Sequence, residues 1–251
     1  MLFLLTGIIT FISEYLDSGL GMGYGTALAP VLIIMGHEPL KVVPAILVSQ
    51  LFTDIAACVF HHNLRNVDLN FRSSDFRIAS LLGLISAAGV IVSVFVAVRI
   101  PKWMLTLYIG TLVLMMGVII MATIKRPMRF SWRKIAGISL LASFNKGISG
   151  GGYGPLVMGG QLISGVNAKN AVGITAFSEA ITCLVGFLAY IASGRAIDWK
   201  LTGILVLFAT GAVPVAAFTV KNIYSDRLKK YIGILIIMLG AATIFKVSLG
   251  G

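Results

Sequence analysis

Charge is scarce in this chain of 251 residues, and acidic charge is the scarcest: Lys and Arg number 20, Asp and Glu only 9. Charged residues make up 12% of the sequence, about half of the roughly 25% found in soluble domains. Hydrophobic residues make up 58%, and the mean hydropathy is +0.97. This composition excludes an ordinary water-soluble domain and predicts an integral membrane protein.

Cysteine is almost absent. Cys58 and Cys183 both fall in apolar segments, where small core residues are expected in preference to a disulfide or a metal pair. Neither a CxxC pair nor a His/Cys cluster occurs, and the HExxH and Walker patterns of common enzymes are missing as well. We therefore expect no metal, no cofactor and no enzymatic activity.

Long apolar runs are what the chain has in quantity. Ile78–Val98 and Leu201–Val220 carry no charge, and each is close to the ~20 residues that cross a bilayer. Together with similar runs they predict three membrane spans in each half of the chain, at Val42–Phe60, Phe76–Val98 and Lys102–Ile124, and at Ala171–Ala192, Leu201–Val220 and Leu228–Val247. Most of the net charge of +11 lies in loops between these runs. The expected partner is therefore the lipid bilayer and not nucleic acid.

Two glycine-rich segments interrupt the apolar sequence, Asp17–Gly25 and Asn145–Pro155. Glycine permits positive φ and close backbone approach, so each segment predicts a break between two short apolar helices. Those helices are expected at Leu2–Leu16 and Thr26–Met35, and at Ile135–Phe144 and Leu156–Ile163. At ~1.5 Å per residue they are marginal for a ~30 Å hydrocarbon core. Re-entrant hairpins and short tilted spans both remain open.

The two breaks belong to an internal repeat, in which one constant interval separates Gly21 from Gly150 and Tyr24 from Tyr153. The same interval relates Ser49 to Ser178 and Gln50 to Glu179. We therefore predict an all-α membrane protein of two repeats, each a glycine-broken hairpin followed by three transmembrane helices. The repeats are residues 1–124 and 132–251, joined by a basic linker at 125–131, and together they form one transport domain.

Loop charge predicts the orientation. If loops 62–77, 125–134, 165–170 and 221–230 share one face, that face holds thirteen cations and the other holds six, with Lys146 left out. The positive-inside rule then places the linker in the cytoplasm and both termini outside. In this arrangement the two repeats are inverted relative to each other.

The breaks are the predicted substrate site, because unpaired N–H groups at the start of a helix attract anions. The alternative is that the glycines only allow tight helix packing. The candidate substrate-binding residues are Gly21, Gly23, Tyr24, Gly25, Ser49, Gln50, Asn145, Lys146, Gly151, Gly152, Tyr153, Gly154 and Ser178.

Charged residues inside apolar segments are costly and therefore candidates for function. Glu14, Asp17, Asp54, Lys146 and Glu179 are of this kind. Lys146 either pairs with Asp17 or neutralises an anionic substrate. Glu179 is a candidate for carrying the coupling ion, with Asp17 and Asp54 as further candidates. The structural alternative is that Lys146 simply holds Glu179 in place.

At these residues the sequence resembles the TauE/SafE sulfite exporter family. The resemblance rests on Gly21–Gly25, on Gly36–Leu40, on His61 with Arg65–Asp68, and on the second copy at Ser149–Pro155 followed by Ser178 and Glu179. It implies an anion carrier in the inner membrane of a prokaryote, acting on sulfite, organosulfonates or related small anions. The first repeat has Gln50 where the second repeat has Glu179. If the acid is needed for coupling, the two halves are not equivalent in function.

The function expected from all this is a secondary transporter, working as an exporter. A small sulfur-containing anion would bind near mid-membrane between the two breaks, and transport would be coupled to protons. A passive anion channel and a non-transporting sensor or assembly factor are the alternatives. The substrate, the direction and a homodimeric state are left open.

The predicted orientation can be tested by cysteine labelling in a background without Cys58 and Cys183. Met128→Cys should react with a membrane-impermeant thiol reagent from the cytoplasmic side only, and Ala196→Cys, in a loop of the opposite face, from the outside only. Labelling of residue 128 from outside alone would contradict the orientation.

Overall fold

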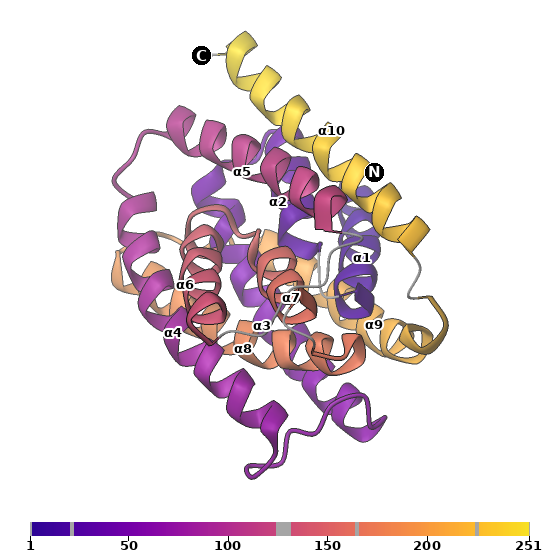
Figure 1. Ribbon diagram of the computed structural model, residues 1–251. Coiled ribbons are helices and arrows are strands. Elements are labelled where there is room, and N and C mark those ends of the chain that lie inside the picture. The colour runs from indigo at the N-terminus through magenta and orange to yellow at the C-terminus, as the bar shows by residue number, and fades with distance from the viewer. Residues whose placement is uncertain (1, 21–22, 124–131, 164–165, 224–225, 251) are drawn as a thin grey trace.

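The computed structural model describes residues 2–20, 23–123, 132–163, 166–223 and 226–250, and these contain helices and no strand (Figure 1). The helices are α1 Leu2–Leu20, α2 Tyr24–Ile34, α3 Pro39–Asn63, α4 Ser74–Ala97, α5 Lys102–Thr123, α6 Trp132–Ser149, α7 Tyr153–Ile163, α8 Ala168–Ala192, α9 Trp199–Ile223 and α10 Asp226–Gly250. The all-α class is therefore confirmed.

Five described helical segments are long and apolar enough to cross a membrane: Pro39–Asn63, Ser74–Ala97, Lys102–Ile119, Lys169–Ala192 and Trp199–Phe218. They match five of the six predicted spans. The sixth prediction, Leu228–Val247, lies in α10, whose described apolar stretch is the shorter Ile234–Ser248. Large apolar side chains such as Leu84, Leu207 and Phe218 are exposed on the outside. Such a surface suits lipid and not water, so the chain is a multi-pass membrane protein.

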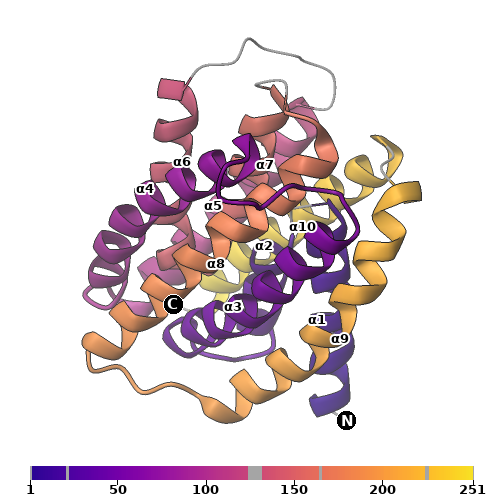
Figure 2. The same cartoon turned by 90° about the horizontal axis from the view of Figure 1, so that it is seen from below.

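The two halves pack on each other through matching helices. α1 lies against α9 and α6 against α4, while α3 packs on α8 and α5 on α10. The contact of α1 with α9 corresponds to that of α6 with α4, while α3 with α8 and α5 with α10 each join corresponding helices of the two halves. Figure 2 shows α1 beside α9 and α3 beside α8. The main hydrophobic core mixes residues of both halves. The inverted orientation and the domain boundaries stay predictions, and the linker at 125–131 lies outside the described residues.

The helix ends at the breaks differ from the prediction. α1 runs on to Leu20 and α6 to Ser149, so the expected ends at Leu16 and Phe144 are wrong. The last turn of α6 is kept because Gly150 N–H donates to the carbonyl of Lys146 and the Ser149 hydroxyl donates to that of Asn145. The second break is therefore confined to Gly150–Gly152. Gly150 and Gly152 there have φ values of 74° and 80°, a conformation that favours glycine.

The two breaks touch each other through their backbones. A Cβ atom on Gly25 would overlap the carbonyl oxygen of Gly150, and one on Gly151 would lie 2.6 Å from the backbone nitrogen of Thr26. Glycine at these positions thus allows one break to cross the other. The glycines therefore do allow close packing at this crossing, which is the alternative role considered for them. The crossing brings the ends of α1, α2, α6 and α7 close together.

Gly25→Ala should destabilise the protein by about 1–3 kcal/mol or more, because the added methyl group overlaps backbone that cannot turn away. Gly19→Ala is the matched control, since a Cβ there meets nothing within 4 Å and alanine favours the helix. Thermal unfolding in detergent should show a lower midpoint for the first variant and an equal or higher one for the second. Equal midpoints would contradict the contact between the breaks.

Candidate functional site

Four polar side chains converge next to the crossing: Asp17 of α1, Gln50 of α3, Lys146 of α6 and Glu179 of α8. Their exposed fractions are 8%, 1%, 1% and 3%. Lys146 is the repeat equivalent of Asp17, and Glu179 that of Gln50, because the interval that relates the two glycine motifs also relates these positions. The cluster therefore consists of two equivalent pairs, one member from each half.

A continuous set of hydrogen bonds joins these four residues. The Lys146 ammonium donates to Glu179 Oε1 at 2.6 Å and also to Gln50 Oε1. The Gln50 amide nitrogen donates to Asp17 Oδ2 and to Glu179 Oε1, both at 3.1 Å. Lys146 is thus paired with Glu179, and Gln50 stands between it and Asp17. The alternative in which Lys146 simply holds Glu179 in place requires a direct contact between them, and that contact is present.

Two more carboxyl groups belong to the same region. Glu14 accepts hydrogen bonds from Ser18 Oγ at 2.6 Å and from Thr53 Oγ1 at 3.2 Å. Asp54 lies 3.9 Å from the thiol of its repeat equivalent, Cys183. Glu14 was expected only to be an intramembrane charge, with no role assigned. It lies one helical turn before Asp17 on the same face of α1, and this spacing is the signal that links the two residues.

The cluster holds more acid than base. Glu14, Asp17, Asp54 and Glu179 face a single ammonium, that of Lys146, and all are buried. Burying several carboxylates without partners is very costly, so the hydrogen bonds from Lys146, Gln50, Ser18 and Thr53 are needed to hold this set in place. The cavity that several of these groups line is only about 10 Å³, room for about one water molecule. The site is closed in this conformation.

The backbone N–H groups at the breaks have partners within the protein. Those of Gly23 and Tyr24, at the start of α2, lie near the Asp17 carboxylate. Gly151 N donates to Ser149 Oγ at 3.1 Å, and Gly152 N donates to Thr26 Oγ1 at 3.0 Å. An anion that used these donors would have to displace the protein's own acceptors. Gly21 lies outside the described residues.

The predicted aromatic and hydroxyl residues are hydrogen-bonded, but the two repeats differ in their partners. The Tyr24 hydroxyl lies 2.7 Å from Ser49 Oγ, whereas the Tyr153 hydroxyl lies 3.0 Å from Ser86 Oγ and Ser178 Oγ donates to the carbonyl of Thr175. Both tyrosines are fully buried, and Gly154 beside Tyr153 is buried too. Asn145 accepts a hydrogen bond of 2.6 Å from Tyr108. These residues brace the helix ends around the cluster.

His61 is fully buried near the end of α3. Its Nε2 lies 3.2 Å from the carbonyl oxygen of Ser18. A carbonyl only accepts, so Nε2 carries the hydrogen. The repeat equivalent Tyr190 makes the matching bond to the carbonyl of Gly147, at 2.8 Å. Both side chains thus hold the last turn of the helix that enters a break.

Cys183 is drawn into the polar centre, where its sulfur lies within 4.8 Å of a carboxyl oxygen of both Asp54 and Glu179. The sequence treated this cysteine as a small core residue, which its burial supports. Its place beside two acids became visible only when α3 and α8 were packed together. Cys58, the other cysteine, is half-buried.

An apolar outer surface around a buried, closed polar centre defines a polytopic membrane protein of the transporter class. The profile of the family "Sulfite exporter TauE/SafE" matches residues 5–243, so the chain belongs to the TauE/SafE family. It is also similar to a "Probable membrane transporter protein YtnM" of Bacillus subtilis (strain 168). That relative is 22% identical over 249 residues, which cover 94% of this chain and 80% of the relative. No solved structure matches the chain.

The pair of Lys146 and Glu179 can be tested by a double-mutant cycle. Lys146→Met alone should cost about 3–5 kcal/mol, because it leaves a buried carboxylate unpaired. Adding Glu179→Gln should recover part of this loss. Lys102→Met is the control, since Lys102 pairs with Glu38 at the surface, where both side chains are exposed, and should change little. Additive effects of the first two substitutions on the free energy of unfolding would contradict the coupling.

Proposed function

We propose that this protein is a secondary transporter of a small sulfur-containing anion such as sulfite or an organosulfonate. It works as a proton-coupled exporter in the inner membrane of a prokaryote. Membership of the TauE/SafE family supports transport as the activity, and the relative from Bacillus subtilis carries the name of a membrane transporter. The family's printed name supports sulfite as the substrate, and organosulfonates are included as related small anions.

One observation carries the mechanism: a single buried ammonium is held by a carboxylate at the crossing of the two breaks. Among the described residues, Lys146 is the only buried Lys or Arg. Its Nζ lies 2.6 Å from Glu179 Oε1, with which it forms an ion pair. An incoming anion competes with Glu179 for this charge. Protonation of Glu179 removes the competitor and frees Lys146, so that proton binding and anion binding strengthen each other.

The other carboxyl groups act in the same direction. Glu14, Asp17 and Asp54 repel an anion while they are ionised and no longer do so once protonated. Protonation of Asp17 also weakens its hold on the N–H groups of Gly23 and Tyr24, which then become available at a helix start. The coupling protons are thus carried by the predicted set, Glu179, Asp17 and Asp54, with Glu14 added.

Access to this centre requires movement, because the cavity beside the carboxyl groups is too small for sulfite. The two halves meet through reciprocal helix contacts, and a shift of one half against the other opens the crossing first to one side and then to the other. The anion then binds near mid-membrane between the breaks.

A carrier is favoured over a passive channel because the only buried cation among the described residues is neutralised in the closed state. A channel would instead offer its charge to ions along an open path. Proteoliposomes decide between them. A carrier accumulates sulfite against its gradient when a proton gradient is imposed, whereas a channel only equilibrates it. A sensor or assembly factor gives no flux at all.

Glu179→Gln should keep anion binding but lose much of its pH dependence, because the amide resembles the protonated acid while Glu14, Asp17 and Asp54 still titrate. Methanesulfonate is the preferred probe, since its own charge does not change over the pH range used. Binding to the unmodified protein should strengthen as the pH falls, while Lys146→Ala should abolish binding. Glu38→Gln, which removes a surface acid, is the control. An unaltered pH dependence in Glu179→Gln would remove Glu179 from the coupling step.

A further inference from the structure

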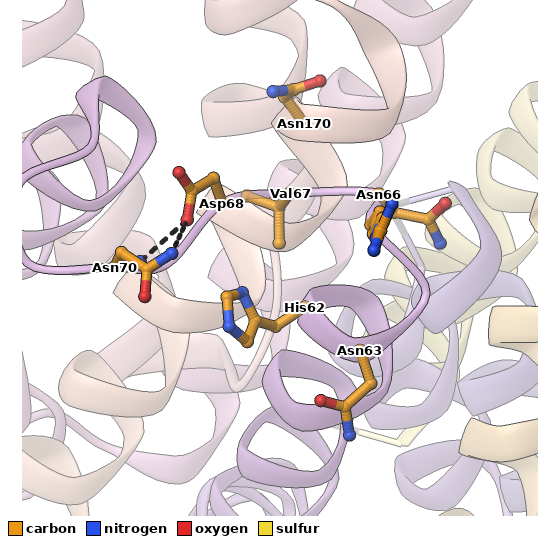
Figure 3. Close-up of a pocket in the computed structure, with 8 residues that line it drawn as sticks. His62, Asn63, Asn66, Val67, Asp68, Asn70 and Asn170 are labelled. Carbon is orange, nitrogen blue, oxygen red and sulfur yellow. Dashed lines mark hydrogen bonds between the residues drawn. The ribbon is translucent and has the colours of Figure 1, made fainter.

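A second polar cavity, of about 540 Å³, lies at the end of α3 and along the loop that leads to α4 (Figure 3). Four asparagines line it together with His62, Arg65 and Asp68. None of these residues belongs to the buried cluster described above. The cavity is large enough for a sulfonate or sulfite with part of its hydration shell.

Two of the acceptors that line this cavity, Asp68 Oδ1 and His62 Nδ1, already have donors, and the lining also includes donor groups. Asp68 Oδ1 already accepts from the backbone and the side-chain nitrogen of Asn70, at 3.0 and 2.6 Å. His62 Nδ1 accepts from the N–H of Leu69 at 3.3 Å, so the hydrogen of the neutral ring is on Nε2. His62, Asn63 and Arg65 thus supply donors to the cavity. Such a lining suits an anion.

Arg65 has a backbone conformation that is costly for any residue with a Cβ atom. Its φ is 56°, and it is the only non-glycine residue with positive φ among those described. Its equivalent in the second repeat, at the interval that also relates Gln50 to Glu179, is Gly194, with φ 73°. The first repeat therefore keeps an arginine where the same turn is easily made by glycine. Strained residues of this kind concentrate at functional sites.

The fold makes no visible use of the Arg65 side chain. It is exposed, and within the described part of the chain its guanidinium has neither an ion pair nor a hydrogen bond. A guanidinium offers five N–H donors in a plane that matches the oxygens of a sulfonate or a phosphate. No contact of the Arg65 side chain within the described part of the chain therefore accounts for the cost of the turn.

Polar contacts connect this cavity with the buried centre. Asn66, which lines the cavity, lies 3.1 Å from Nδ1 of His61. His61 in turn donates to the Ser18 carbonyl, and the Ser18 hydroxyl donates to Glu14. The cavity therefore borders the residues that hold the end of α1 and its carboxyl groups. It also opens on the face to which the basic loop 62–77 belongs, where cations raise the local concentration of anions.

We propose that this cavity is a second anion site, a vestibule that receives a small oxyanion before it enters the membrane. Arg65 supplies the charge, and His62 and Asn63 orient the oxygens. The proposal rests on the proposed function for the identity of the solute. A phospholipid headgroup offers the same oxyanion chemistry, so the experiment has to distinguish the free solute from lipid.

The decisive variant is Arg65→Gly, because glycine relieves the backbone and removes the guanidinium together. Its thermal midpoint in detergent should equal or exceed that of the unmodified protein. The KM for sulfite should rise roughly tenfold or more, as expected for loss of a charge-assisted hydrogen bond, with little change in the maximal rate. This rise should occur in membrane vesicles of one orientation only, the one in which loop 62–77 faces the added sulfite.

Two further variants sharpen the test. Arg65→Lys keeps the charge and should recover part of the affinity, although not the planar geometry. Arg72→Gln removes an exposed charge from the same loop without touching the cavity and should leave the KM nearly unchanged. An equal rise in KM for Arg72→Gln and Arg65→Gly would overturn the vestibule, because only the general charge of the loop would then matter.

The remaining outcomes separate this proposal from the proposed function. Normal transport with an unchanged KM in Arg65→Gly refutes the vestibule and leaves the transporter standing. A sulfite-induced thermal shift that depends on Arg65, without any transport by the unmodified protein, supports the vestibule and refutes the transporter. If Arg65→Gly retains less phosphatidylglycerol in detergent but binds sulfite normally, the ligand is a lipid headgroup and the solute proposal fails.

Discussion

The structure depends on the hydrogen-bond acceptors that surround the Lys146 ammonium in an apolar interior. A buried cation without partners is very costly, and here Glu179 and Gln50 supply them. Through Gln50 the same network reaches Asp17. One cation therefore ties together α1, α3, α6 and α8, two helices from each half, at the point where the glycine breaks cross. The position that stabilises the assembly is also the one at which an anion would compete.

The asymmetry between the repeats has a physical reason at this centre. Equivalent residues of two related halves meet where α3 packs on α8, as Gln50 does with Glu179 and Asp54 with Cys183. Two glutamates or two aspartates in direct contact would repel each other unless protonated, whereas an amide or a thiol can donate to the acid opposite. Away from the centre the bracing contacts keep their form, as in His61 with Ser18 and Tyr190 with Gly147.

Much of the fold could be predicted because it follows from local pattern. Apolar run length located five of the six expected spans among the described helices, and the constant interval between the two glycine motifs identified which positions correspond. The helix ends could not be predicted in the same way. Glycine density placed a break from Asn145 onward, but hydrogen bonds continue the helix to Ser149. Composition indicates that a helix is interrupted, while the residue at which it stops depends on what packs around it.

By itself the sequence determined the membrane class, the repeat, the two glycine breaks and the short set of charged residues inside apolar segments, because hydropathy and glycine content are local properties. Only the tertiary structure decided that Lys146 binds Glu179 and not Asp17, that Glu14 joins the carboxyl cluster, and that Arg65 turns in a glycine-like conformation beside a cavity. Each of these depends on how helices distant in the chain pack against one another. In an apolar interior a charge takes whichever partner that packing brings within reach.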